Sequence, residues 1–213
     1  MHTLWIPETI LYDGAQLRPH WILEQTGAVG DAIAAFVGPA KVTAAHMVDW
    51  EDVRAQAWIH SDAMLHFIVE HFETDLTRMI LWQRLLVAIC HDVLRSHCPA
   101  ISIRREGDDL FDGVAKLSVS IATVSPISSL IHTGINVLNT NTPVPTRGLQ
   151  DYDIAAAPFA KDVMDRYAVE FAEVQHARAK VRPVGLELTS KPSRAAQGQG
   201  APGPSNRSVR SCT

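Results

Sequence analysis

The sequence has little that would suit a membrane protein or a disulfide-linked one. No apolar run reaches the roughly 18 residues that a membrane-spanning helix needs. The first residues, MHTLWIPETILYDG, lack the basic-then-apolar order of a signal peptide. The chain has only three cysteines, and none of them are spaced like a zinc ligand set. We therefore expect a cytoplasmic protein with no membrane contact and no cysteine-bound zinc.

Basic residues are also scarce. The 213 residues include 19 Lys and Arg against 23 Asp and Glu, for a net charge of -4, and the basic residues include four in an acid-free stretch that begins at Ser190. Nucleic-acid binding needs clustered Lys and Arg to neutralise phosphates. We therefore do not expect broad nucleic-acid contact, although transfer RNA stays open. The expected partner is a small-molecule ligand, and a homodimer is compatible with the sequence.

The common motifs of nucleotide-binding and hydrolytic enzymes are missing. The sequence contains no Walker loop, no G-x-G-x-x-G, no G-x-S-x-G and no H-E-x-x-H. Hydrophobic residues nevertheless make up 46% of the chain, enough for a sizeable core. From Ser190 the composition changes to Gly, Pro, Ser, Gln and Arg. This change predicts one domain over 1–189 and a disordered tail over 190–213.

Residue periodicity predicts alternating strands and helices within that domain. We expect helices opened by Thr43 and Thr74, and a third amphipathic helix near the end of the domain. The expected strands are 31–38, 58–72, 100–105, 116–124 and 130–138, and the expected helices are 43–56, 74–97 and 158–180. Strands joined by hairpins and covered by helices predict an α+β domain with a mostly antiparallel sheet.

The stretch EGDDLFDGVAKLSVSIATV (106–124) places a lysine where a strand should begin. A hairpin turn explains Gly113, but it does not explain Lys116. Strand alternation would put Lys116, Ser118 and Ser120 on one face, which could donate hydrogen bonds, and Leu117, Val119 and Ile121 on the other. The face with Lys116 is either a solvent-facing strand side or a wall that holds an anionic or carbonyl-bearing ligand.

A second group of polar residues follows the strand expected over 58–72. His60, Asp62, His66 and Glu70 would share one of its faces, and Leu65, Phe67 and Val69 would share the other. At about 3.3 Å per residue they would spread over roughly 30 Å, too far for one metal ion to bind all four. Acid/base or hydrogen-bonding work by one or two of them is the favoured interpretation. A metal-dependent hydrolase using His60, Asp62 and His66 is kept as an alternative.

Two further segments carry candidate binding residues. LRPHW (17–21) combines Arg18 and His20 with a tryptophan, which suits either a ligand clamp or a surface turn over the core. Asp49 and Asp52 are spaced to share a helix face, which suits either Mg²⁺ or solvent. Cys90 falls in an apolar helical run and is predicted to be a core residue rather than a nucleophile.

RREGDDLFDGVAKLSVSIA followed by HTGINVLN resembles the central block of biotin protein ligases, and AWIHSDAMLHF is similar to the Val-x-His-Asp stretch of lipoate ligases. The resemblance implies a biotin/lipoate-ligase-like fold, related to class II synthetase domains. It places Lys116 at the ligand-contacting lysine, Asp109 at the end of the acidic turn, and Asn136 in the later Gly-Ile-Asn-Val strand. Further segments are LRPHWI, GDAIAAFVG, MVDWEDV, SDAMLHFIVEHF, QRLLVAI, RREGDDL and KLSVSIATVSPISSLIHTGIN. With these segments the chain resembles, over about 1 to 182, a family called domain of unknown function 366.

The resemblance also implies roles for individual residues. Lys116 would contact a carbonyl or phosphate oxygen where charge develops. Asp108 or Asp109 would orient an amine or ribose hydroxyl, and His66 or His60 would carry a proton. The remaining candidates for ligand binding lie in the two segments RPH and REGDD: Arg18 and His20 in the first, Arg105 and Glu106 in the second.

The resemblance does not extend to the phosphate-binding loop. Biotin and lipoate ligases have a glycine-rich loop here, whereas RAQAWIHSD (54–62) contains no glycine. ATP and Mg²⁺ are therefore left open as cofactors. The leading hypothesis is a ligase or acyltransferase acting on a small acyl, carboxylate or nucleotide-like ligand. The alternatives are a non-catalytic metabolite-binding module and the metal-dependent hydrolase.

Overall fold

The computed structural model describes residues 1–140, 142 and 144–184. Met1–Ala179 form one compact unit. The strands are β1 (His2–Trp5), β2 (Ala32–Val42), β3 (Ile59–His71), β4 (Ile103–Glu106), β5 (Asp109–Asp112), β6 (Ala115–Lys116), β7 (Ser118–Val124) and β8 (Ser129–Asn136). The helices are α1 (Trp21–Thr26), α2 (Trp50–Ala55), α3 (Leu76–His97) and α4 (Ala156–Lys180), with a 3-10 turn at Leu149–Tyr152. The domain boundary and tail predicted from Ser190 onward lie outside the described residues.

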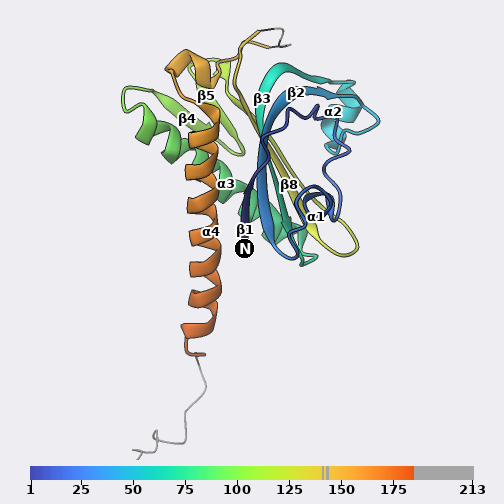
Figure 1. The fold of residues 1–213 in the computed structure, drawn as a ribbon, viewed down its shortest axis with the longest axis vertical. Coiled ribbons are helices and arrows are strands. Elements are labelled where there is room, and N and C mark those ends of the chain that lie inside the picture. The colour runs from blue at the N-terminus through green and yellow to red at the C-terminus, as the bar shows by residue number, and fades with distance from the viewer. Residues whose placement is uncertain (141, 143, 185–213) are drawn as a thin grey trace, which may run out of the picture. The chain divides into compact units, whose positions relative to one another are not determined.

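The main sheet has five strands in the order β1-β2-β3-β8-β7 (Figure 1). Strands β1 and β2 are parallel, and every other neighbouring pair is antiparallel. A second sheet has the order β4-β5-β6. The predicted class is confirmed: an α+β domain whose mostly antiparallel sheet is flanked by helices. Among the described residues, no helix combines the length and the apolar character needed to cross a membrane.

The main sheet is covered by apolar side chains on both faces. On one face, Leu65, Phe67 and Val69 of β3 join the buried cluster to which α3 and α4 contribute. On the other face, Phe36 and Ile68 belong to a smaller cluster with side chains of α1. The two-faced character predicted for the 58–72 strand is therefore confirmed. Strand alternation makes β3 a partition between two cores.

The helix predicted over 43–56 is wrong in its first half. Helix α2 begins only at Trp50, because Asp49 is the N-cap and its side chain accepts a hydrogen bond from the Glu51 amide. The N-cap of α3 is likewise Asp75 rather than Thr74. The Asp75 carboxylate accepts from the Arg78 amide at 2.9 Å. In both cases an aspartate further along the chain than the expected threonine accepts from an open amide of the first turn.

The strand predicted to close at Gly38 instead continues to Val42. Its pairing with β3 shifts register between Gly38 and Ala40. The register shift brackets Pro39, which has no amide hydrogen to give to a ladder. A Cβ on Gly38 would lie 1.8 Å from the Ile10 carbonyl oxygen, so this position admits no side chain.

The strand predicted over 116–124 is divided between the two sheets. Lys116 ends β6, which pairs with β5 in the small sheet, whereas β7 pairs with β8 in the main sheet. Leu117 joins them and is fully buried; its amide donates to the Leu110 carbonyl at 2.8 Å. Its own carbonyl accepts from the Asn136 amide at 2.9 Å. Leu117 is thus the residue at which the chain passes from one sheet to the other.

Candidate functional site

Two adjoining cavities lie on the face of the main sheet that carries Tyr12 and Val42, opposite α3. The first, of about 240 Å³, is lined by four aspartates, and we call it the acidic cavity. The second, of about 220 Å³, is named the Trp58 cavity after its exposed tryptophan. They share the lining residues Asp52, Ile59, Lys116 and Val119 and together form the groove. The chemically notable members are Tyr12, Asp49, Asp52, Asp108, Asp109, Lys116 and His132 in the acidic cavity, and Trp58, His60, Lys116, Ser118 and Asn136 in the Trp58 cavity.

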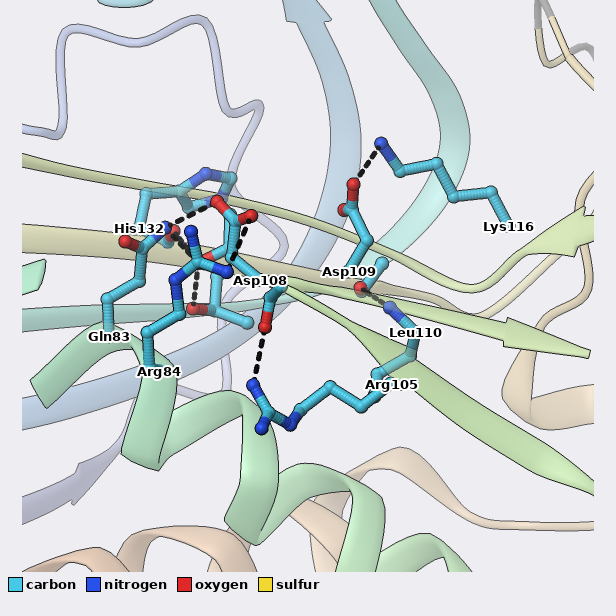
Figure 2. Close-up of polar contacts among 12 residues, drawn as sticks. Gln83, Arg84, Arg105, Asp108, Asp109, Leu110, Lys116 and His132 are labelled. Carbon is cyan, nitrogen blue, oxygen red and sulfur yellow. Dashed lines mark hydrogen bonds and ion pairs between the residues drawn. The ribbon is translucent and has the colours of Figure 1, made fainter. Parts of the chain in front are cut away.

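Lys116 is common to both cavities and is paired with Asp109. Its Nζ lies 2.9 Å from Asp109 Oδ2, and Figure 2 shows the two side chains pointing toward each other. The lysine side chain stays 31% exposed, so its ammonium can still meet a ligand. Burial raises the pKa of Asp109, and the hydrogen bond from Lys116 opposes that shift.

The backbone around Lys116 is held from both sides. Its amide donates to the Pro145 carbonyl at 2.9 Å, and its carbonyl accepts from the Arg147 amide at 3.2 Å. The Asn136 side-chain amide donates to the same carbonyl at 3.3 Å. Asn136 therefore both lines the Trp58 cavity and supports the lysine backbone. The sequence-based expectation that Asp109, Lys116 and Asn136 lie together agrees with this geometry.

Asp108 is held by helix α3 rather than by the hairpin. Gln83 donates to its Oδ2 at 3.0 Å, and Arg84 lies 3.5 Å from its Oδ1 (Figure 2). Sequence reasoning missed Gln83 and Arg84. The available signal was a glutamine at core spacing between Met79 and Leu86, since a buried amide needs a polar partner. Asp108 is thus oriented before any ligand arrives.

The two serines do not form the expected donor face with Lys116. Ser118 is fully buried, and its hydroxyl accepts from the Leu110 amide at 2.8 Å. Ser120 borders the acidic cavity, but its hydroxyl accepts from Gln83 at 3.1 Å and contacts the Thr133 hydroxyl at 2.9 Å. The break at Leu117 separates Lys116 from the alternation of β7, so period-two reasoning does not carry across it. Val119 and Ile121, which were expected to face away from Lys116, also line the acidic cavity.

His66 lies behind the groove rather than in it. It is fully buried, stacked on Tyr12 and Phe36 with ring centroids 4.9 Å away in each case. Its Nε2 is 3.2 Å from the Gly38 carbonyl oxygen, and its Nδ1 is 3.0 Å from Nε2 of His132. Burial lowers the pKa of His66 to about 3. His132, which the sequence reasoning missed, lines the acidic cavity, as does His46.

Four expected binding residues are not brought into the groove. Arg18 is ion-paired with Glu24 beside α1, and His20 lines a separate small cavity with Glu70. Arg105 donates to the Gly107 carbonyl at 2.6 Å, and Glu106 is exposed and paired with a neighbouring arginine. None of the four lines either cavity. Residues near Lys116 in the chain are therefore not all near it in space.

The three residues of the metal-hydrolase alternative are also separated. His60 lines the Trp58 cavity, whereas His66 is buried behind the other cavity. Asp62 accepts a hydrogen bond from the Thr140 hydroxyl at 3.1 Å. Within 1–140, 142 and 144–184, no group of three or more His, Cys, Asp or Glu side chains is placed to hold a metal ion. The extended strand keeps the three apart, as its rise per residue requires.

Comparison with known proteins finds a matching family and relatives of the same fold. The family model described as domain of unknown function (DUF366) matches residues 1–182. The uncharacterised protein MJ0805 of Methanocaldococcus jannaschii is 32% identical over 191 residues, which cover 86% of each chain. A solved protein of unknown function from Pyrococcus horikoshi matches with a TM-score of 0.79 and 34% identity, over 85% of this chain and 99% of that one.

More distant solved structures show which known fold this chain resembles. A biotin protein ligase from Aquifex aeolicus, solved in complex with biotin and ATP, matches with a TM-score of 0.56. Its identity is 13%, over 81% of this chain and 72% of that one. At this identity the likeness concerns the fold alone. The predicted biotin/lipoate-ligase-like fold is confirmed.

Proposed function

We propose a function for this chain, which belongs to the DUF366 family. The proposal is based on the groove that the ligase-like fold forms beside Lys116. The protein binds a small acyl, carboxylate or nucleotide-like ligand in this groove and catalyses its ligation or transfer to an acceptor. The observation that carries the proposal is the position of Lys116, which lines both cavities while Asp109 holds its ammonium.

A fixed ammonium at the junction of two cavities suits acyl or phosphoryl chemistry. Such chemistry develops negative charge on an oxygen, and a cation already in place stabilises it without reorganising. Lys116 meets this condition because Asp109 orients its side chain and three backbone contacts hold its main chain. One cavity would hold the ligand and the other its acceptor, with the reacting oxygen near the lysine.

The ligand class follows from the fold and from the lining. A protein of this fold has been solved with biotin and ATP, a carboxylic acid and a nucleotide. Here Ile59, Met64 and Val119 give the Trp58 cavity an apolar floor. Trp58 is 56% exposed at its edge, and a planar ring can stack on an indole of this kind.

The absence of glycine from RAQAWIHSD supports a second candidate, a binding module without turnover. This stretch forms the end of α2 and the start of β3, with Gln56 in the left-handed conformation. Its side chains occupy a segment that is glycine-rich in the ligases it resembles. ATP with Mg²⁺ is therefore a co-substrate to be tested rather than assumed.

The test compares two lysine-to-methionine variants. Both Lys116 and Lys161 pair with an aspartate, but Lys161 does so on the surface of α4, outside the groove. Wild type, Lys116→Met and Lys161→Met are screened by thermal shift with ATP and Mg²⁺, biotin, lipoate and a non-hydrolysable acyl-adenylate. We expect stabilisation of wild type and Lys161→Met by at least one compound, and none of Lys116→Met.

Pyrophosphate release from ATP with the stabilising acid then separates the two candidates. Release by wild type and its loss in Lys116→Met support ligation, whereas stabilisation without release supports the binding module. Equal stabilisation of Lys116→Met and wild type by every compound would refute the role of Lys116 in both.

A further inference from the structure

We propose that the acidic cavity binds a protonated primary amine, which donates one N–H hydrogen bond to Nδ1 of His132. The further step, that this amine is the acceptor of the ligation, rests on the proposed function. The binding of the amine in the acidic cavity does not depend on it. Three observations carry the amine site: the charge of the lining, an unpartnered nitrogen of the buried His132 and the apolar side chains beside them.

The lining is strongly acidic. Asp49, Asp52, Asp108 and Asp109 contribute four carboxylates. Lys116 pairs with Asp109 and Arg84 with Asp108, which leaves the carboxylates of Asp49 and Asp52 without a cationic partner among the described residues. The remaining negative charge favours a cation and disfavours a carboxylate ligand. Asp52 has no hydrogen-bond or ion-pair partner for its side chain among the described residues, so its carboxylate is available.

His132 supplies the second observation, a nitrogen without a hydrogen-bond partner in a buried residue. Its side chain lines the cavity in a residue that is only 3% exposed. The Gly38 carbonyl can only accept a hydrogen bond, so Nε2 of His66 must carry the ring hydrogen. In the neutral ring, Nδ1 of His66 then carries no hydrogen and can only accept. His132 therefore donates from its Nε2 to His66, which leaves its own Nδ1 as a lone pair. Among the described residues that nitrogen has no donor.

The histidine is fixed rather than free to turn. Its ring stacks on Tyr12 at a centroid distance of 3.8 Å and an interplanar angle of 13°. Burial, with the neighbouring His66, holds the pKa of His132 well below its usual range. The ring therefore stays neutral and keeps its lone pair at physiological pH. It accepts a hydrogen bond and does not add positive charge to the acidic lining.

The amine is preferred over other cations by the same groups. A quaternary ammonium has no N–H for His132, and a neutral alcohol leaves the carboxylates uncompensated. A metal ion would need three or more His, Cys, Asp or Glu side chains placed to coordinate it, and the described part of the chain has no group so placed. Ile59, Val119 and Ile121 line the same cavity and can contact an alkyl chain on the amine.

The test follows the imidazole nitrogens of His132 by ¹⁵N NMR while n-butylammonium is added to the full chain. We expect the Nδ1 signal of His132 to move, with saturation, and n-butanol, butyrate and tetramethylammonium to leave it in place. A charge-assisted hydrogen bond contributes about 1.5–3 kcal/mol, so its loss weakens binding by roughly tenfold or more. Asp52→Asn and His132→Gln should each raise the dissociation constant of n-butylammonium by that factor.

His132→Gln keeps a donor toward His66 but loses the Nδ1 acceptor and the ring that stacks on Tyr12. Asp52→Asn changes a partly exposed residue, so at least one variant should fold. Asp165→Asn, on the surface of α4, is the matched control and should bind like wild type. An unmoved Nδ1 signal, an equal response to n-butanol, or unchanged affinity in both variants would overturn the site. Amine binding without pyrophosphate release would remove the ligation and leave the amine site intact.

Discussion

Acidification should destabilise the protein through the buried histidine His66. Burial lowers the pKa of this group to about 3 in the folded chain, whereas its ordinary value is 6.5. Between these values the unfolded chain binds one proton more than the folded one, so stability is full above pH 6.5 and falls as the pH drops toward 3. From about pH 7.5 to about pH 5.0 the loss from His66 alone is about 2 kcal/mol. His132 shifts in the same direction and adds to it.

The assay is urea unfolding followed by tryptophan fluorescence, for which the buried Trp21 and Trp82 are reporters. It compares wild type with His66→Phe across this pH range. The phenyl ring can keep the stacking on Tyr12 and Phe36 but cannot titrate. His66→Phe should be less stable at neutral pH, because Gly38 and His132 lose their partner, yet its stability should fall less steeply with acid. The difference in slope is about 1.4 kcal/mol per pH unit. Equal slopes in the two proteins would refute the buried, neutral histidine.

Three further outcomes follow from contacts outside the groove. Gly38→Ala places a Cβ 1.8 Å from the Ile10 carbonyl oxygen and should cost about 1–3 kcal/mol or more of unfolding free energy in urea, since backbone must move; wild-type stability would contradict the close approach. Glu70→Gln should lower it by about 1–3 kcal/mol, because Oε1 of this buried carboxylate accepts from the Ser128 hydroxyl at 2.7 Å and Oε2 from the His20 amide at 3.1 Å, and the substitution turns one of the two acceptors into an NH2 donor; an unchanged denaturation midpoint would argue against these bonds. Burial raises the pKa of the Cys90 thiol, so iodoacetamide followed by mass spectrometry should leave Cys90 unmodified in the folded protein and alkylate it in urea; rapid native labelling would show it accessible.

Local sequence patterns predicted the elements whose signals are strong. The long apolar periodicity of 74–97 predicted α3, and the alternation of 58–72 predicted β3 with its two faces. Boundaries were less well predicted where two capping residues are adjacent. Asp75 rather than Thr74 caps α3, and the choice depends on which side chain reaches an open amide.

The candidate site was predicted only where neighbouring residues stay neighbours. The order of Asp109, Lys116 and Asn136 in the sequence suggested a shared site, and the structure brings them together. Arg105 and Glu106 are nearer to Lys116 in the chain than Asn136 is, but they have other partners: Arg105 donates to the Gly107 carbonyl, and Glu106 is paired with Arg104. Proximity in sequence did not distinguish these two outcomes.

The sequence by itself determined the class of fold, the lysine and the acidic turn, because these depend on local periodicity and on a motif of adjacent residues. Only the tertiary structure decided that His66 is hidden and that His132, 66 residues later, takes the place at the cavity. The physical reason is strand pairing. The register of β3 with β8 sets Ile68 opposite His132 and His66 opposite Gly134, and no local pattern encodes which strands become neighbours.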